Sequence, residues 1–281
     1  MGDLAETQRF CGKLAYDGTN YFGFQRQAKR LPSIQSDVEA AVLKITGQNV
    51  TVLGAGRTDT GVHATGQIVT FDVTWNFEDA ALLRALNAVL PDAIAFQAMT
   101  RVDKSTRFHP RFSAVSRLYK YTMAHTFFRQ PLLRHRTWRV WGKLDKEAMQ
   151  YAASLLIGTH DCAAFGLPPQ GENTVRTIYR SKWESREEDD CELWVYSIEG
   201  SAFLHHMVRR IVGMMMDIGR GFYTVDDFEQ KFRSAKLVTH GTMAPPHGLV
   251  LTQVRFPENL APFNELVTGQ QAGETPAGGK E

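Results

Sequence analysis

The spacing of apolar residues in the first hundred positions predicts alternating strands and helices. Two-residue alternation and short apolar runs predict strands at 10–17, 67–73 and 93–99. Three- and four-residue spacing predicts a helix at 33–46, which Ser33 caps, and a second at 78–89, which Pro91 stops. This half is therefore predicted to run strand, helix, strand, helix, strand.

The rest of the chain carries a similar mixture. Strands are predicted at 116–124, 175–184, 191–199 and 248–255. Helices are predicted at 146–157, 203–218 and 225–235, the last capped by Thr224. The two halves have a similar order of strands and helices but no residue-level repeat. The similar order alone is only a topological hint that the halves are alike.

Two polar stretches are predicted to lie outside the packed core. Residues 184–192 include four consecutive acidic residues, from Glu187 to Asp190, and are predicted to form a solvated hairpin tip. After about Pro262 the chain has too few apolar residues to bury, and we expect it to be disordered.

Composition indicates an ordinary globular protein. Its 281 residues are enough for one large domain or two modest ones, and 43% are hydrophobic and 22% charged. The three cysteines, Cys11, Cys162 and Cys191, are far apart and odd in number, which favours a reducing cytosol over a disulfide framework or a zinc site. The N-terminus lacks the apolar core of a signal peptide and no apolar run reaches about eighteen residues, so secretion and membrane spanning have no support.

Basic and aromatic residues are concentrated between Lys104 and Leu144. This segment has ten Lys or Arg residues and no Asp or Glu, although the whole chain carries a net charge of only +2. Eight aromatic residues are interleaved with them. Cations neutralise phosphate and rings accept base faces, so the mixture suits a polyanion with unstacked bases. A solvated basic face with its aromatic residues in the core explains the composition equally well.

A glycine-rich loop is the strongest local signal. Residues 54–67 read G-A-G-R-T-D-T-G-V-H-A-T-G-Q, with one carboxylate, Asp59, among four glycines. Gly54, Gly56, Gly61 and Gly66 permit positive φ angles and close backbone approach, which predicts a tight loop able to admit a ligand. Asp59 stands where a dinucleotide fingerprint needs glycine, and no G-x-x-x-x-G-K-[ST] occurs.

Asp59 itself has two interpretations. An aspartate in such a turn usually bonds its own backbone. Alternatively, a polar loop anchored to the strand at 67–73 presents Asp59 as a reactive group.

The loop resembles the catalytic loop of the TruA family of tRNA pseudouridine synthases, whose pattern is G-R-T-D-x-G-V-H-A. Every fixed position matches, at residues 56–64. Further stretches resemble the same family in order, at 16–19 with 25–27, 108–112, 116–121, 203–209 and 244–249. The likeness runs from about residue 11 to 256.

This resemblance implies an α+β fold, in which two similar α/β subdomains with mixed, mainly antiparallel sheets join around a central RNA-binding cleft. The implied division is an N-terminal extension at 1–9, subdomains at 10–110 and 111–257, and a tail at 258–281. The implied activity is the isomerisation of uridine to pseudouridine at positions 38, 39 and 40 of the tRNA anticodon stem-loop, with base flipping. The implied enzyme needs no cofactor and no metal, binds tRNA but no membrane, is cytoplasmic and forms a homodimer.

The resemblance also implies the site residues. Asp59 is expected to be catalytic, and Arg209 to hold its charge, with a guanidinium fork that can bind the carboxylate through two nitrogens. Helical spacing predicts that His205 projects beside Arg209. Tyr119 is expected to stack on the uracil, its hydroxyl a candidate acceptor of the C5 proton, and Arg57 to fill the space left by the flipped nucleotide or to grip its phosphate. The other expected substrate-binding residues are His63 and Leu249.

Each assignment has a plainer alternative. From helix geometry alone Arg209 is a surface arginine, and from burial statistics Tyr119 is a core residue. A metal-dependent hydrolase using His63, His205 and His206 has little support, since H-E-x-x-H is absent and no carboxylate or cysteine accompanies these histidines in sequence. A noncatalytic RNA-binding protein would use the same basic and aromatic surface, although no RNA-recognition signature is present.

Overall fold

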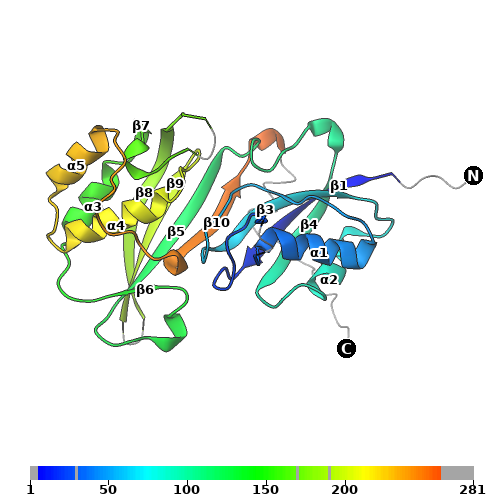
Figure 1. The fold of residues 1–281 in the computed structure, drawn as a ribbon, viewed down its shortest axis with the longest axis horizontal. Coiled ribbons are helices and arrows are strands. Elements are labelled where there is room, and N and C mark those ends of the chain that lie inside the picture. Colours follow the sequence, from blue (N-terminus) through cyan, green and yellow to red (C-terminus); the bar gives the residue numbers. More distant parts are fainter. Residues whose placement is uncertain (1–5, 29–30, 169–170, 189–190, 261–281) are drawn as a thin grey trace, which may run out of the picture.

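One mixed sheet runs through the molecule, with helices in two groups (Figure 1). The computed structural model describes residues 6–28, 31–168, 171–188 and 191–260. The strands are β1 (Gln8–Tyr16), β2 (Leu53–Gly54), β3 (His63–Val73), β4 (Ile94–Val102), β5 (Ser116–His125), β6 (Trp138–Val140), β7 (Gly158–Asp161), β8 (Val175–Glu188), β9 (Cys191–Gly200) and β10 (Leu249–Arg255). The helices are α1 (Ile34–Thr46), α2 (Asp79–Asn87), α3 (Lys146–Ser154), α4 (Met207–Gly219) and α5 (Val225–Arg233). The predicted α+β class is confirmed.

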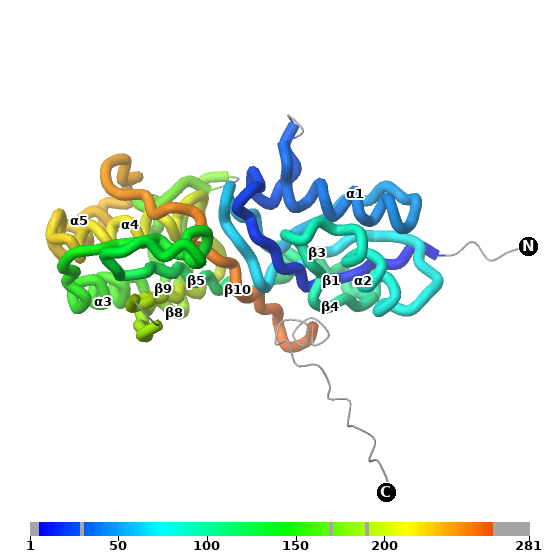
Figure 2. The backbone as a smooth tube through the Cα atoms, turned by 90° about the horizontal axis from the view of Figure 1, so that it is seen from below, coloured from blue at the N-terminus to red at the C-terminus, as the bar shows by residue number. Residues whose placement is uncertain are grey.

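Strand β10 joins the two halves of the sheet. The strand order is β4-β1-β3-β10-β5-β9-β8-β7, with β2 paired to β3 and β6 to β5. β10 is parallel to β3, with Val250 opposite His63, and antiparallel to β5, with Leu251 opposite Tyr119. The two halves lie on either side of β10 (Figure 2). The last strand therefore brings the loop before β3 close to Tyr119.

Two predicted helix caps are confirmed. The Ser33 side chain accepts a hydrogen bond from the Ser36 N–H in a capping box, and Gly47 ends α1 in the left-handed conformation. Thr224 forms a capping box with Asp227 at the start of α5. Caps of this kind satisfy N–H groups that have no partner inside the helix, so they can be predicted locally.

The helix predicted at 203–218 begins at Met207, four residues later than expected. His206, the residue before it, has φ 62° and ψ 6°, a left-handed conformation that an α-helix cannot continue through. The prediction that His205 and Arg209 project from one helical face is therefore wrong, because His205 precedes the helix.

The bounds predicted for the acidic hairpin tip are too wide. β8 continues to Glu188, and Glu187 pairs with Glu192 on β9, so most of residues 184–192 are strand rather than hairpin tip. A backbone hydrogen-bond ladder extends regardless of side-chain polarity when the side chains are solvated. Asp189 and Asp190 lie outside the described residues, as does the tail predicted to be disordered.

The remaining boundaries differ by a few residues from those predicted. β1 begins at Gln8, inside the predicted extension, and β4 continues to Val102. Helices α2, α3 and α5 end two or three residues early, where turns replace the helical pattern. None of the described helices has the length and apolar character needed to cross a bilayer.

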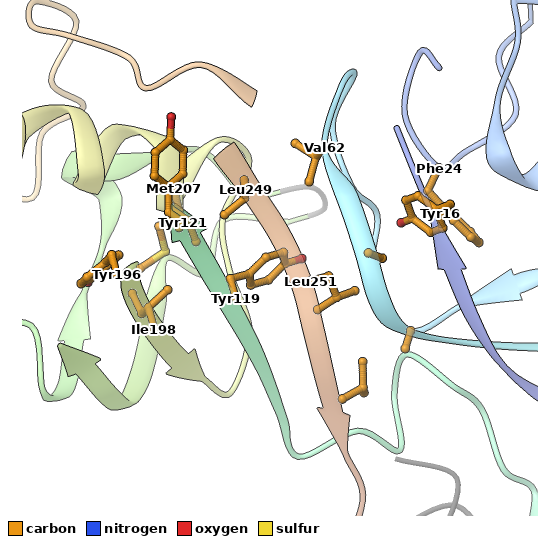
Figure 3. Packing of buried hydrophobic residues seen from close by; sticks show 14 of the residues in the cluster. Tyr16, Phe24, Val62, Tyr119, Tyr121, Tyr196, Ile198, Met207, Leu249 and Leu251 are labelled. Atoms are coloured by element: carbon orange, nitrogen blue, oxygen red, sulfur yellow. The ribbon is translucent and has the colours of Figure 1, made fainter. Parts of the chain in front are cut away.

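Buried residues from both halves form one cluster (Figure 3). Leu249 and Leu251 on β10 belong to this cluster with Tyr119 of β5 and with Val62 in the loop before β3. The core is continuous across β10, which fixes the position of this loop relative to the C-terminal half.

Candidate active site

The loop between β2 and β3 carries Asp59 and is held by contacts on both sides of it. The Gln67 side chain accepts a hydrogen bond from the Gly56 N–H at 3.1 Å and donates one to the Gly56 carbonyl at 2.7 Å. The Thr58 hydroxyl lies 2.7 Å from the Tyr16 hydroxyl on β1. Asp59 is thus presented by backbone that both β1 and β3 support.

The loop glycines serve two different purposes. Of the four, Gly61 alone has a positive φ, at 75°. A Cβ at Gly66 would lie 2.1 Å from the Thr252 carbonyl oxygen on β10, and one at Gly54 would lie 2.5 Å from the Phe24 ring. The predicted positive φ therefore holds only at Gly61, whereas Gly54 and Gly66 are needed for close packing.

A cavity of about 610 Å³ opens beside this loop. Asp59 is the only carboxylate that lines it among the described residues. The basic residues in the lining are Arg57, Arg111, Arg117, Arg176, Arg209, His205 and His206. The cavity is therefore strongly cationic, with a single acid in its wall.

The Asp59 carboxylate faces groups from the start of α4. Its Oδ1 lies 3.6 Å from His205 Nε2, and its Oδ2 lies 3.6 Å from His206 Nε2 and 3.8 Å from Arg209 Nη1. Within the described residues, no hydrogen bond joins the carboxylate to the backbone of its own turn. The described structure therefore gives Asp59 no turn-stabilising role.

The approach of Arg209 Nη1 to Asp59 Oδ2, at 3.8 Å, is too long for a hydrogen bond. Arg209 Nε donates to the Ala244 carbonyl at 2.8 Å, so the two-nitrogen contact considered from sequence is not formed. The side chain is 13% exposed, which excludes a surface arginine. Burial lowers the pKa of Arg209 and the charge of Asp59 opposes that effect, but an arginine stays protonated in proteins. Arg209 is therefore a fixed positive charge beside the carboxylate.

His205 and His206 stack on each other beside Asp59, with ring centroids 3.6 Å apart. Asp59 and the two histidines each offer a donor atom, all within 4.8 Å of one another. No carboxylate lies near these histidines in sequence, but the fold brings the carboxylate of Asp59, from a distant loop, beside them. Asp59, His205 and His206 fit a metal ion poorly, however. The positive charge of Arg209 lies near the same carboxylate, and two stacked imidazole rings do not direct their nitrogens toward one point. We assign no metal to it.

Tyr119 forms part of the cavity wall and projects from β5 across β10 (Figure 3). Its ring packs edge-on against Phe203, with centroids 5.2 Å apart. Burial raises the pKa of Tyr119, and the nearby Tyr16 and Asp59 raise it further. Tyr121, on the same face of β5, is fully buried and donates to the Pro245 carbonyl at 2.9 Å. The predicted alternation is confirmed, and both tyrosines belong to the buried cluster, although Tyr119 also lines the cavity.

Arg57 and Leu249 also line the cavity, as the resemblance implied for substrate-binding residues. Arg57 is exposed. Burial lowers the pKa of Arg111, and the charge of Arg57 lowers it further, so two arginines lie near each other in this wall. Two adjacent cations without an acid between them suit a phosphate.

The basic segment predicted at 104–144 divides between the cavity and the surface. Arg111, Arg117 and Tyr119 line the cavity. Phe127 and Phe128 are 75% and 74% exposed, in the connection that follows β5. These exposed rings contradict a face whose aromatic residues lie in the core, whereas the exposed Arg129, Arg134 and Arg136 fit a solvated basic face.

His63 is the predicted site residue that the structure does not bring to the cavity. Its Nδ1 accepts a hydrogen bond from the Gly18 N–H at 3.0 Å, so its Nε2 carries the proton and faces the His247 carbonyl at 3.1 Å. These contacts tie the turn after β1 to the turn before β10.

Sequence reasoning assigned no role to Arg117, which connects the walls of the cavity. Its Nη1 donates to the Ser201 carbonyl at 2.9 Å and its Nη2 to the Ala55 carbonyl at 3.1 Å and to that of Arg111. The only sequence signal for Arg117 was its position in the family-like stretch at 116–121. Its hydrogen-bond partners are backbone carbonyls, which no sequence pattern reveals.

Comparisons with known proteins identify the family of this chain. A family model described as tRNA pseudouridine synthase matches residues 14–113 and 152–257. The tRNA pseudouridine synthase A of Neisseria meningitidis is 38% identical over 257 residues, which cover 91% of this chain and 95% of that relative. The protein of the same name from Acetivibrio thermocellus is 38% identical over 243 residues (86% and 97%), and that from Chloroflexus aurantiacus is 40% identical over 248 residues (88% and 88%). This chain therefore belongs to the tRNA pseudouridine synthase family.

Proposed function

We propose that this protein is an isomerase that converts uridine to pseudouridine in tRNA. The observation that carries the proposal is that Asp59 is the only carboxylate among the described residues that line the cavity. The other lining residues are basic, aromatic, apolar or neutral polar. Relatives that share 38% to 40% identity are named for this activity. The cations suit an RNA backbone, and the single acid suits a reaction at one sugar.

The target uridine must leave the RNA stack to reach Asp59. Extruding a base costs roughly a few kcal/mol in lost stacking and pairing. A cavity of about 610 Å³ lies within the range of small-molecule sites and is large enough for a nucleoside. We infer that Tyr119 stacks on the extruded uracil, that Arg57 fills the vacated space or grips its phosphate, and that Leu249 contacts the base.

The reaction breaks the bond between N1 and C1′, turns the uracil and rejoins it through C5. Asp59 acts either as a nucleophile or as the base that removes a ribose proton while the uracil departs. Both routes need the carboxylate ionised, and the positive charge of Arg209 at 3.8 Å stabilises the ionised form.

We further propose that the targets are positions 38, 39 and 40 of the anticodon stem-loop, that the enzyme is a cytoplasmic homodimer needing no metal or cofactor, and that its subdomains are 10–110 and 111–257. The family likeness supports these statements. Light scattering at working concentration tests the dimer, and a monomer would contradict it.

The decisive experiment is to incubate unmodified tRNA with the pure protein, with and without excess chelator, and to map pseudouridine. We expect product at positions 38 to 40 in both samples. Product only without chelator would indicate a metal-dependent reaction. Salt-sensitive binding with unchanged uridines would instead support a noncatalytic RNA-binding protein.

A further inference from the structure

Phe22 is a large apolar side chain at the opening of the cationic cavity. It lines the cavity, yet it is 45% exposed to solvent. No other aromatic ring of the described chain packs against it. Single exposed apolar residues are common on protein surfaces, so exposure alone implies no function. The backbone of Phe22, its neighbours in the chain and the charges beside it distinguish it from such residues.

The backbone around Phe22 is fixed against the loop between β2 and β3. The Phe22 N–H donates to the Pro32 carbonyl at 2.9 Å, and the Phe24 N–H donates to the Thr58 carbonyl at 3.0 Å. Gly23, with a φ of 91°, permits this close approach, because a Cβ there would lie 2.7 Å from the Thr58 carbonyl oxygen. The backbone that carries the ring is therefore held next to the reactive loop before any substrate binds.

The residues next to Phe22 divide between the core and the cavity. Tyr21 and Phe24 are buried in the core, which anchors the segment from inside. Gln25 and Gln27 are exposed and line the same cavity as Phe22. An aromatic ring offers a face on which a base can stack, and an amide can hydrogen-bond to the edge of a base. This combination suits an unstacked nucleotide.

The cavity wall divides its polar and apolar tasks between different side chains. Arg57 and Arg111 supply positive charge for phosphates, whereas Phe22 supplies an uncharged ring. Tyr119, which we infer to stack on the extruded uracil, is only 8% exposed and lies inside the cavity. Phe22, with its larger exposure, lies where the cavity meets solvent. Two aromatic rings therefore occur at different depths of one cavity.

We propose that Phe22 is a stacking platform for the base that neighbours the extruded uridine. The inference rests on the proposed function, which puts the uridine itself beside Tyr119. When one base leaves the RNA stack, its neighbour loses a stacking partner, and this loss is part of the cost of extrusion. A ring at the cavity opening replaces the lost partner and so stabilises the extruded state. Phe22 is in this sense a positioning residue and takes no part in bond breaking.

The test compares variants that remove the ring or keep it. Affinities for synthetic anticodon stem-loops are measured by filter binding in the Asp59→Asn background, so that no turnover disturbs the measurement. Phe22→Leu keeps an apolar side chain and should weaken binding about 5- to 150-fold, the loss of one base stack. Phe22→Tyr keeps a ring and should recover most of that affinity. The slope of log affinity against log salt should not change, since no phosphate contact is removed.

Abasic RNAs identify the base that stacks on Phe22. One stem-loop lacks the base on the 5′ side of the target uridine, and a second lacks the base on its 3′ side. On one of them Phe22→Leu should cause little further loss, because the stacking interaction is already absent. On the other the full loss should remain. This pattern would assign the partner base.

Phe222→Leu is the matched control, because Phe222 is 70% exposed and does not line the cavity. It should bind every RNA as tightly as Asp59→Asn alone. Unchanged affinity in Phe22→Leu, or its full loss on both abasic RNAs, would overturn the proposal. A loss that Phe22→Tyr does not recover would overturn it too. If the protein with Asp59 intact bound tRNA but released no tritium from uridines labelled at C5, the proposed function would fail instead.

Discussion

At the scale of single residues, the contacts of Asp59 are electrostatic rather than hydrogen-bonded. The nitrogens of His205, His206 and Arg209 that face its carboxylate lie at 3.6, 3.6 and 3.8 Å, beyond the usual hydrogen-bond range. The carboxylate is therefore near positive charge while its oxygens remain open to a ribose. This combination suits a group that must be ionised and must also react.

Asp59→Asn removes the charge with almost no change in shape. We expect pseudouridine formation to fall by at least about 10²-fold, since no other described carboxylate lines the cavity, while tRNA affinity changes little. Tritium release and filter binding measure the two quantities. Substantial turnover by this variant would remove the role assigned to Asp59.

Replacements of Tyr119 separate its ring from its hydroxyl. Tyr119→Phe keeps the ring and removes only the hydroxyl, the candidate acceptor of the C5 proton, so we expect the rate to fall by about 10²-fold or more, the usual loss for a general base. Tyr119→Leu also removes the platform and should weaken the transition state further, by about 1–3 kcal/mol, the usual worth of a base stack. Single-turnover rates measure both variants. A phenylalanine variant as active as the parent would show that Tyr119 is only a stacking platform.

At the scale of elements, the segment before β10 is held against α4. Asp217 of α4 accepts hydrogen bonds from the Thr242 N–H at 2.8 Å and from its hydroxyl at 2.6 Å. The Ala244 N–H donates to the Arg209 carbonyl at 3.1 Å. These contacts orient the helix whose first turn carries Arg209, so a helix packed in the C-terminal half completes a site on an N-terminal loop.

Gly213→Ala tests this contact. A Cβ at Gly213 would lie 1.8 Å from the Thr242 carbonyl oxygen, so backbone must move. We expect a loss of about 1–3 kcal/mol in the free energy of unfolding, as for overpacked cores, and slower turnover because Arg209 shifts. Denaturant unfolding and tritium release measure the two effects.

Gly219→Ala is the control on the same helix. A Cβ there would meet the side chain of Met149, which is flexible enough to move aside. If both variants were as stable as the parent, the segment would not be held tightly against α4.

At the scale of the whole molecule, β10 determines where the site forms. It pairs with β3 on one side and β5 on the other, so the Asp59 loop and Tyr119 come to the same cavity. The cationic lining comes from both halves, although the net charge of the chain is only +2. Local concentration of charge, and not its sum, favours RNA binding here.

The salt dependence of tRNA binding tests that distribution. Arg57→Gln should reduce the slope of log affinity against log salt by about 0.7–0.9, the change for one lost phosphate contact. Arg186→Gln is the control, because Arg186 lies on β8 away from the cavity and pairs with Glu188. Equal slopes for Arg57→Gln and the parent would exclude a phosphate contact at Arg57.

Structural features that depend only on neighbouring residues could be predicted from the sequence. Ser33 and Thr224 cap helices because a side-chain oxygen reaches N–H groups two or three positions away. The alternation around Tyr119 followed from the pleat of one strand. The ordered motifs, from the loop at 56–64 to the stretch at 244–249, were sufficient to indicate the family.

Contacts between segments that are far apart in sequence became visible only in the tertiary structure. Helical periodicity cannot show that α4 starts at Met207, because His206 keeps its left-handed backbone only in the packed fold. The local sequence pattern also cannot show that His205 and His206 face Asp59. Nor can it show that Arg209 Nε donates a hydrogen bond to the Ala244 carbonyl. These contacts exist because β10 pairs with both halves, and strand pairing between residues far apart in sequence is set by the whole core.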